Sequence, residues 1–155
     1  MPPIITFILD GQRRYVLRYK SDWVAGVTMA TVLLVEDDDQ VRVLAESCLE
    51  QQGHQVLSAG TEGGAIAILK RNVDVDLLFT DIDLKGEIAA GIELALEAKQ
   101  LHPNLRVLYT TSRAVTDGMK ARFVEGSAFL EKPYTVEQLT TALLVHFRIN
   151  TPNCR

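Results

Sequence analysis

The sequence predicts an α/β fold in which five β-strands alternate with five α-helices along residues 31–147. Three observations support this prediction. Short apolar runs recur along the chain, segments with the apolar spacing of an amphipathic helix lie between them, and Gly53 and Pro103 stand where helices should stop. Strands that read as continuous apolar runs are typical of a parallel sheet covered by helices on both faces.

The first two pairs of strand and helix span residues 31–71. The run "TVLLV" predicts the first strand, and apolar residues at helical spacing predict the helix after it, with Asp39 as its N-cap. The run "HQVLSA" predicts the second strand. A helix from about Glu62 to Arg71 follows, although two adjacent glycines lower its helical propensity.

The last three pairs span residues 75–147. The runs "VDLLFTD", "LRVLYTT" and "SAFLE" predict the third, fourth and fifth strands. The segment "GIELALEAKQLH" predicts the third helix, and residues 115–125 predict a poorer amphipathic helix. A capping box, Thr135-x-x-Gln138, predicts the start of the last helix, which continues to Phe147.

Composition limits the possible functions. The chain has 155 residues, of which 47% are apolar and 23% charged, as expected for one globular domain with an appendage. The net charge of −4 argues against nucleic-acid binding, which needs a clustered basic face. No apolar run approaches the roughly 20 residues that span a bilayer. The two cysteines show no pairing pattern, and the N-terminal residues lack the basic segment and cleavage site typical of a signal peptide, so we expect a cytoplasmic protein.

Residues 1–28 stand outside the alternation. Two β-rich runs flank Asp10-Gly11, which is a hairpin signal. Alternatively, Met29 is the natural start and the upstream residues come from an overextended reading frame. We therefore expect an N-terminal extension at 1–28, the main domain at 29–149 and a tail at 150–155, and a real hairpin could offer an edge for a homodimer.

Polar residues follow directly on the apolar strands. Glu36 and Asp37 come after the first strand, Asp81 ends the third, Thr111 ends the fourth and Lys132 follows the fifth. Ligands of open α/β sheets bind at the carboxyl ends of the strands, so these side chains should converge. Carboxylates, a hydroxyl and a lysine at one edge indicate a phosphoryl-transfer site with a divalent cation.

The chemistry of phosphoryl transfer requires these residue types. An aspartate can attack a phosphoryl group as a nucleophile and form an acyl phosphate. Because both groups are negative, a hard cation such as Mg²⁺, held by one or two carboxylates, would remove the repulsion. A lysine and a threonine could then hold the phosphoryl oxygens. The four acids at 36–39 are thus interpreted as half of a metal site, and the alternative is a solvated, acid-rich helix start.

Four motifs, "VLLVEDDD", "DLLFTDI", "VLYTTS" and "GSAFLEKPY", occur in this order. With them, the chain from about Thr31 to Phe147 resembles the receiver domain of two-component response regulators. The resemblance implies a doubly wound, flavodoxin-like (βα)5 sandwich whose five parallel strands have the order 2-1-3-4-5.

The resemblance also implies an acceptor and its cation site. Asp81 corresponds to the phosphoacceptor, and Glu36 and Asp37 correspond to the acids that bind Mg²⁺ or Mn²⁺ together with Asp81. The backbone carbonyl of Asp83 falls where the family supplies another metal ligand, whereas the Asp83 side chain is expected to be exposed.

Three further positions follow from the resemblance. Thr111 corresponds to the hydroxyl residue that responds to the phosphoryl group, and Lys132 to the lysine that binds it. Phe129 occupies the place of the switch aromatic, and the Lys132-Pro133 peptide is expected to be cis. A simpler interpretation is that Thr111 only satisfies backbone groups at the strand end.

The chain departs from the family pattern near the acceptor. Lys85 stands four residues after Asp81, where the family often has proline, and the loop "LKGEIAAG" is about two residues longer than usual. The segment before the fifth strand is one residue short. These departures remove no site residue, but they bear on the rate of phosphorylation and on the choice of partner.

The leading hypothesis is a stand-alone receiver that takes a phosphoryl group on Asp81 from a sensor histidine kinase or a histidine phosphotransfer protein. It would catalyse only its own phosphorylation and dephosphorylation, and would signal to a downstream protein through the face formed by residues 115–148, or act as a phosphorelay intermediate. One alternative is a phosphatase like the haloacid dehalogenases, since Asp81-x-Asp83 follows an apolar strand. The other is a pseudo-receiver, an interaction module that is never phosphorylated.

Overall fold

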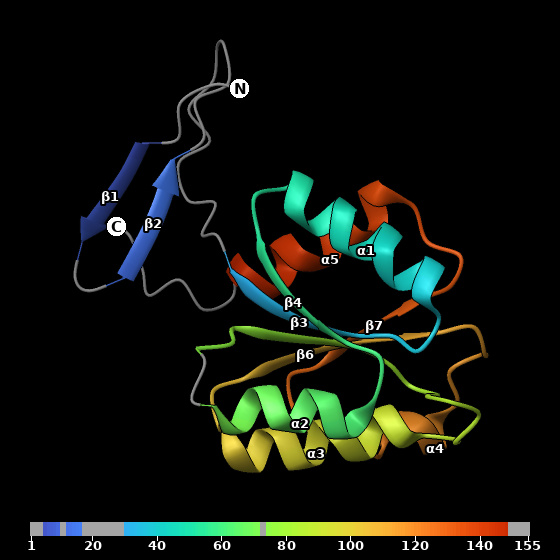
Figure 1. Ribbon diagram of the computed structural model, residues 1–155. Helices are drawn as coiled ribbons and strands as arrows, with labels where there is room; N and C mark the ends of the chain where they lie inside the picture. Colours follow the sequence, from blue (N-terminus) through green and yellow to red (C-terminus); the bar gives the residue numbers. More distant parts are fainter. Residues whose placement is uncertain (1–4, 10–11, 17–29, 72–73, 149–155) are drawn as a thin grey trace.

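The computed structural model describes residues 5–9, 12–16, 30–71 and 74–148 (Figure 1). Within them, the main sheet contains five parallel strands in the order β4-β3-β5-β6-β7. Its strands are β3 (Thr31–Val35), β4 (Gln55–Ala59), β5 (Leu77–Asp81), β6 (Arg106–Thr111) and β7 (Ala128–Glu131). Counted from β3, this order is 2-1-3-4-5, which confirms the predicted fold.

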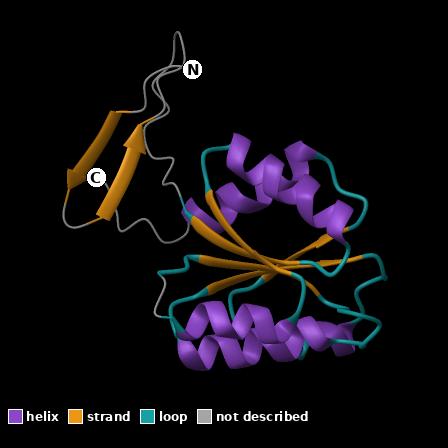
Figure 2. Cartoon of the chain, in the orientation of Figure 1, coloured by secondary structure: helices purple, strands orange, loops and turns teal. Residues whose placement is uncertain are grey.

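Helices cover both faces of the sheet. They are α1 (Asp39–Gln51), α2 (Glu62–Lys70), α3 (Ala90–Leu101), α4 (Asp117–Lys120) and α5 (Val136–Arg148). Helices α1 and α5 lie on one face, and α2, α3 and α4 lie on the other (Figures 1 and 2). The chain therefore forms three layers, with the sheet in the middle, as a doubly wound fold requires.

Each face of the sheet has its own apolar core. Val32 and Leu34 of β3 pack with α1 and α5, whereas Leu33 and Val35 pack toward α2 and α3. All four side chains are at most 2% exposed. Because successive side chains of a strand point to opposite faces, a strand that is buried on both faces must be apolar throughout. This explains the unbroken run "VLLV".

The N-terminal strands form a separate sheet. β1 (Ile5–Leu9) and β2 (Gln12–Val16) pair antiparallel with each other and with none of the five parallel strands. The expected turn at Asp10-Gly11 lies outside the described residues, as do residues 17–29 and the tail at 150–155. The division into an extension, a main domain and a tail stays a prediction.

The N-terminus of α1 differs by one residue from the prediction. Asp38, not Asp39, is the N-cap: its backbone is extended, and its carboxylate accepts hydrogen bonds from the N–H groups of Gln40 and Val41. Asp39 is the first helical residue and forms an ion pair with Arg42. The prediction was wrong here because consecutive acids are equally good caps by residue type.

Helix α4 is much shorter than the predicted segment 115–125. It covers four residues and begins at the N-cap Thr116. After it, the N–H groups of Arg122 and Phe123 donate to carbonyls three residues earlier, so the chain continues as tight turns. These turns bring Phe123 against the core. A longer helix would do the same, so the apolar spacing alone could not distinguish the two.

The capping box at the start of α5 is confirmed, because Thr135 and Gln138 exchange both expected hydrogen bonds.

The helices in the described part of the chain were also compared with the length and apolarity that crossing a bilayer requires. None of them meets both requirements.

Replacing the N-cap should destabilise the domain more than replacing its neighbour. We expect Asp38→Ala to lower the free energy of unfolding by about 1 kcal/mol, because two backbone N–H groups lose their acceptor. The matched variant Asp39→Ala removes only an exposed ion pair and should cost at most about 0.5 kcal/mol. Urea denaturation of both variants measures the difference, and equal losses would contradict the assignment of the cap.

Candidate functional site

Two acids lie side by side at the carboxyl edge of the sheet. Val35 of β3 pairs in register with Thr80 of β5, so Glu36 and Asp81 are the next residues on neighbouring strands. Glu36 is 3% exposed and Asp81 9% exposed. The parallel register therefore places two nearly buried carboxylates next to each other.

Asp37 completes a cluster of carboxylates. One oxygen from each of Glu36, Asp37 and Asp81 lies within 4.8 Å of the others, so the three could bind one metal ion. Oxygen ligands of this kind suit a hard divalent cation such as Mg²⁺ or Mn²⁺. Burial is the largest effect and raises the pKa of Glu36, and the charge of Asp81 raises it too. Lys132 and the Asp38 N–H lower this pKa, but the net pKa lies above its ordinary value. A bound cation would oppose this shift.

Lys132 neutralises part of the cluster. Its Nζ donates to Glu36 Oε2 at 2.6 Å and to Asp81 Oδ2 at 2.8 Å. Burial lowers the pKa of Lys132, but the hydrogen bonds and charges of the two acids raise it by more, and the net pKa lies above its ordinary value. The Lys132-Pro133 peptide is cis, as expected. The lysine thus binds the same two carboxylates that a metal ion would need.

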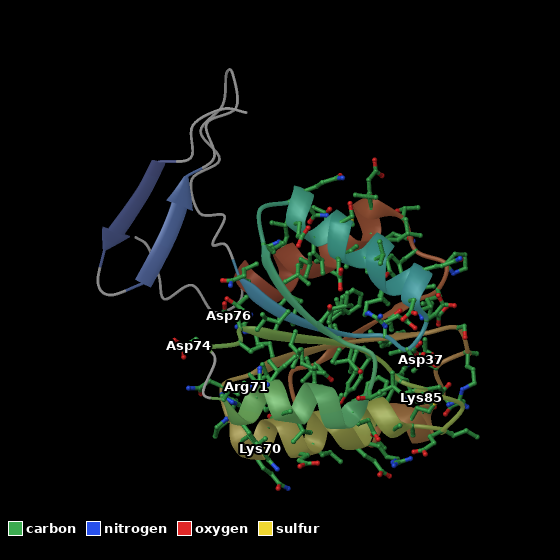
Figure 3. The ribbon with its side chains drawn as sticks, viewed as in Figure 1. Asp37, Lys70, Arg71, Asp74, Asp76 and Lys85 are labelled. Atoms are coloured by element: carbon green, nitrogen blue, oxygen red, sulfur yellow. The ribbon has the colours of Figure 1, made fainter. Side chains whose placement is uncertain are left out.

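The conformation of the loop after Asp81 explains why this chain has Lys85 where the family often has proline. Lys85 has φ 51° and Gly86 has φ 76°, and Leu84 and Glu87 pair across them in a tight turn. Proline cannot adopt a positive φ. The Lys85 backbone N–H also donates to Asp37 Oδ2 at 3.0 Å, so this turn lies against the carboxylate cluster at one edge of the sheet (Figure 3).

Gly91 allows α3 to approach β5 closely. A Cβ atom at this position would lie 1.8 Å from the carbonyl oxygen of Asp81. Its N–H donates to the carbonyl of Ile82 at 2.8 Å. A side chain here would push α3 away from β5, which ends at Asp81.

The Asp83 side chain is not merely exposed, as the sequence suggested. Its two carboxylate oxygens accept hydrogen bonds from Arg113 at 2.6 and 2.9 Å, and one of them also accepts from the Ala89 N–H. Burial raises the pKa of Asp83, but these bonds lower it by more, so the net pKa lies below its ordinary value. The ion pair links the loop after β5 to the loop after β6. The Asp83 side chain is therefore held by this ion pair. That the Asp83 backbone carbonyl binds a metal ion stays a prediction.

Thr111 is bound to its own loop in this structure. Its Oγ1 accepts a hydrogen bond from the Arg113 N–H at 3.0 Å and is fully buried. Among the described residues, no hydrogen bond joins Thr111 to Asp81. The structure therefore brings Glu36, Asp37, Asp81 and Lys132 together, and leaves the Thr111 hydroxyl with a different partner.

Phe129 lies at the edge of an aromatic cluster. It is 36% exposed, and its ring lies 6.1 Å from that of Phe123, which stacks on Tyr109 at 4.4 Å. The ammonium of Lys120 lies 5.7 Å from the centre of the Phe129 ring. A rotation of Phe129 would thus change contacts with the α4 region, but its role as a switch stays a prediction.

With this geometry described, comparison with known proteins identifies the family. The family model for the response regulator receiver domain matches residues 32–144. This span is more than half of the chain, and the protein therefore belongs to the response regulator receiver domain family.

Similar curated proteins are mostly much longer than the matched region. The transcriptional regulatory protein YrkP of Bacillus subtilis (strain 168) is 30% identical over 118 residues, which are 76% of this chain and 49% of that protein. The sensor kinase CckA of Brucella abortus (strain 2308) is also 30% identical over 118 residues, which are 74% of this chain and 12% of the kinase. The chain thus spans half or less of these relatives.

Solved structures agree with this assignment. A response regulator receiver protein from Sinorhizobium medicae WSM419 has a TM-score of 0.70 at 29% identity, covering 77% of this chain and 95% of that one. The receiver domain of the hybrid histidine kinase CckA has a TM-score of 0.63 at 26% identity, covering 76% and 98%.

The ion pair between the two loops should control the titration of Asp83. In Arg113→Gln, we expect the pKa of Asp83 to rise, because the charged partner and its two-point contact are lost. The depressed pKa stabilises the folded protein above the ordinary carboxyl pKa, and this contribution is lost as the pH falls through the lower, folded value. The stability difference between the two proteins should therefore shrink in acid.

Carboxyl NMR titration in the presence of a chelator measures this shift. Arg122→Gln is the matched control, because Arg122 pairs with the exposed Glu93 and should leave Asp83 unchanged. An unchanged pKa of Asp83 in Arg113→Gln would show that the pair does not persist in solution.

Proposed function

We propose that this receiver domain accepts a phosphoryl group on Asp81 from a phosphohistidine of a sensor histidine kinase or a histidine phosphotransfer protein. The carboxylate cluster at the ends of β3 and β5, with Lys132 bound to it, is the observation that supports this proposal most strongly. Relatives named as sensor kinases, CckA and AruS of Pseudomonas aeruginosa, support the class of donor.

The reaction is an in-line transfer to a carboxylate oxygen. An oxygen of Asp81 attacks phosphorus and forms the acyl phosphate as the P–N bond to the donor imidazole breaks. The imidazole nitrogen keeps the electron pair and takes a proton from solvent. Lys132 then binds the transferred oxygens, and the Thr111 hydroxyl leaves the Arg113 N–H to do the same.

The proposed metal ligands are the carboxylates of Glu36, Asp37 and Asp81 and the backbone carbonyl of Asp83. Mg²⁺ or Mn²⁺ bound there would neutralise the negative charge of both reactants. Asp37 accepts the Lys85 N–H through one carboxylate oxygen, which leaves its other oxygen for the cation. The domain turns over no separate substrate in this scheme, and acts only on its own acyl phosphate.

The output is proposed to leave through protein contact on residues 115–148. Phosphorylation adds about −1.5 to −2 charges at Asp81. Release of Thr111 from Arg113 would move the loop after β6. Phe129 packs through Phe123 against Tyr109, which lies two residues before Thr111 on the same strand. A downstream protein that binds α4, β7 and α5 would therefore distinguish the two states.

The alternatives are weaker on specific grounds. Membership in the receiver family argues against a phosphatase of the haloacid dehalogenase type. The Asp83 side chain, which such a phosphatase would need near the acceptor, is held by Arg113. A pseudo-receiver would have no need of buried acids that cluster around a lysine, and the following experiment separates it from a working receiver.

Incubation with Mg²⁺ and a small acyl-phosphate or phosphoramidate donor should add one phosphoryl group to the protein. We expect Asp81→Asn to abolish this gain, because the amide cannot serve as the nucleophile, and we expect a chelator to lower it strongly because the acids then repel the donor. Intact mass spectrometry measures the gain directly.

Asp74→Asn is the matched control, because this exposed acid lies at the opposite end of the sheet (Figure 3). It should be labelled like the unchanged protein. Labelling that persists in Asp81→Asn would overturn the site assignment, and no labelling of any protein would favour the pseudo-receiver.

A further inference from the structure

One buried hydroxyl near the site has no partner. Thr110 is 3% exposed, and among the described residues its Oγ1 is the buried side-chain atom without a hydrogen bond. The neighbouring Thr111 and Thr80 hydroxyls both have partners. Buried hydroxyls are nearly always hydrogen-bonded, so a buried hydroxyl without a hydrogen bond requires an explanation.

The register of the sheet places this hydroxyl beside the acceptor. Thr110 of β6 pairs with Asp81 of β5 on one side and with Leu130 of β7 on the other. Paired residues of parallel strands have their side chains on the same face. Leu108, two residues earlier on β6, packs in the core under α1 and α5, which assigns Thr110 and Asp81 to that face.

Lys132 must cross this position to reach the acids. Strand β6 lies between β5 and β7, and Lys132 follows β7, with its N–H donating to the Thr111 carbonyl at 2.7 Å. Its Nζ nevertheless contacts Asp81 on β5. The side chain therefore passes over the end of β6, where Thr110 lies. An ammonium has three donors, and two of them go to Glu36 and Asp81.

We propose that Thr110 is a positioning residue that accepts a hydrogen bond from the Lys132 ammonium once a divalent cation occupies Glu36 and Asp81. This inference rests on the proposed function, because it presupposes the cation site. Cation binding takes both carboxylates away from Lys132, and a hydroxyl beside Asp81 keeps the ammonium at the acceptor. Without the cation the hydroxyl has no partner, so it stabilises only the metal-bound state.

The test compares Thr110→Val with Thr110→Ser. Valine has nearly the same shape but no hydroxyl, and serine keeps the hydroxyl. We expect Thr110→Val to weaken Mg²⁺ binding about fivefold, because one hydrogen bond is lost from the metal-bound state only. We expect Thr110→Ser to bind Mg²⁺ within about twofold of the unchanged protein. Titration calorimetry measures both affinities.

The stability of the metal-free protein distinguishes a positioning role from a structural role. A structural role for Thr110 predicts that Thr110→Val lowers this stability. Metal-free Thr110→Val should be at least as stable as the unchanged protein, because no hydrogen bond is lost there. Lower metal-free stability together with unchanged Mg²⁺ affinity would assign Thr110 to the fold alone and overturn the inference.

A double-mutant cycle tests the route through Lys132. In a Lys132→Ala background, Thr110→Val should leave Mg²⁺ affinity unchanged, because the ammonium that uses the hydroxyl is gone. An equal fivefold loss in that background would overturn the inference. If the unchanged protein binds no Mg²⁺, the proposed function and this inference both fail. If it binds Mg²⁺ and Thr110→Val does not alter the affinity, only this inference is overturned.

Discussion

The structure depends on the contact between one lysine and two nearly buried acids at the ends of adjacent parallel strands. Glu36 and Asp81 are neighbours because β3 and β5 are paired in register, and two like charges so close would repel each other. Lys132 offsets this repulsion from the end of β7. The same contact joins three strands of the sheet at one edge. It also leaves carboxylate oxygens in excess, which is what a divalent cation requires.

Among the described residues, three polar side chains beside this contact already have partners, whereas Thr110 has none. Thr111 binds the Arg113 N–H, Asp83 binds the Arg113 guanidinium, and Asp37 binds the turn at Lys85. Under the proposed function, phosphorylation would therefore exchange these hydrogen bonds rather than create bonds from free groups. An exchange has a small net free energy, because each new bond replaces one of similar strength. Two states separated by a small free energy are what a reversible signal needs.

The sequence predicted the strands well because each is buried on both faces and must be apolar throughout. It also predicted which residues end those strands, since that depends only on local position. It could not predict the contact between Asp83 and Arg113, which are 30 residues apart and meet only because two loops fold together. The short α4 was missed because turns and a helix bury Phe123 equally well. Thr110 did carry a signal, since a polar residue inside "VLYTT" interrupts a buried face.

The two consecutive threonines at the end of β6 face opposite sides of the sheet. Thr110 shares its face with Asp81 and Lys132, on the side of α1 and α5. By alternation, Thr111 lies on the side of Tyr109, where Phe123 and Phe129 also pack. In the proposed function, the Thr111 hydroxyl binds the phosphoryl group over the carboxyl end of β6, so a change at the carboxylate cluster would reach the opposite face through this one residue. This arrangement explains how chemistry on one face could alter the surface on the other without any rearrangement of the sheet.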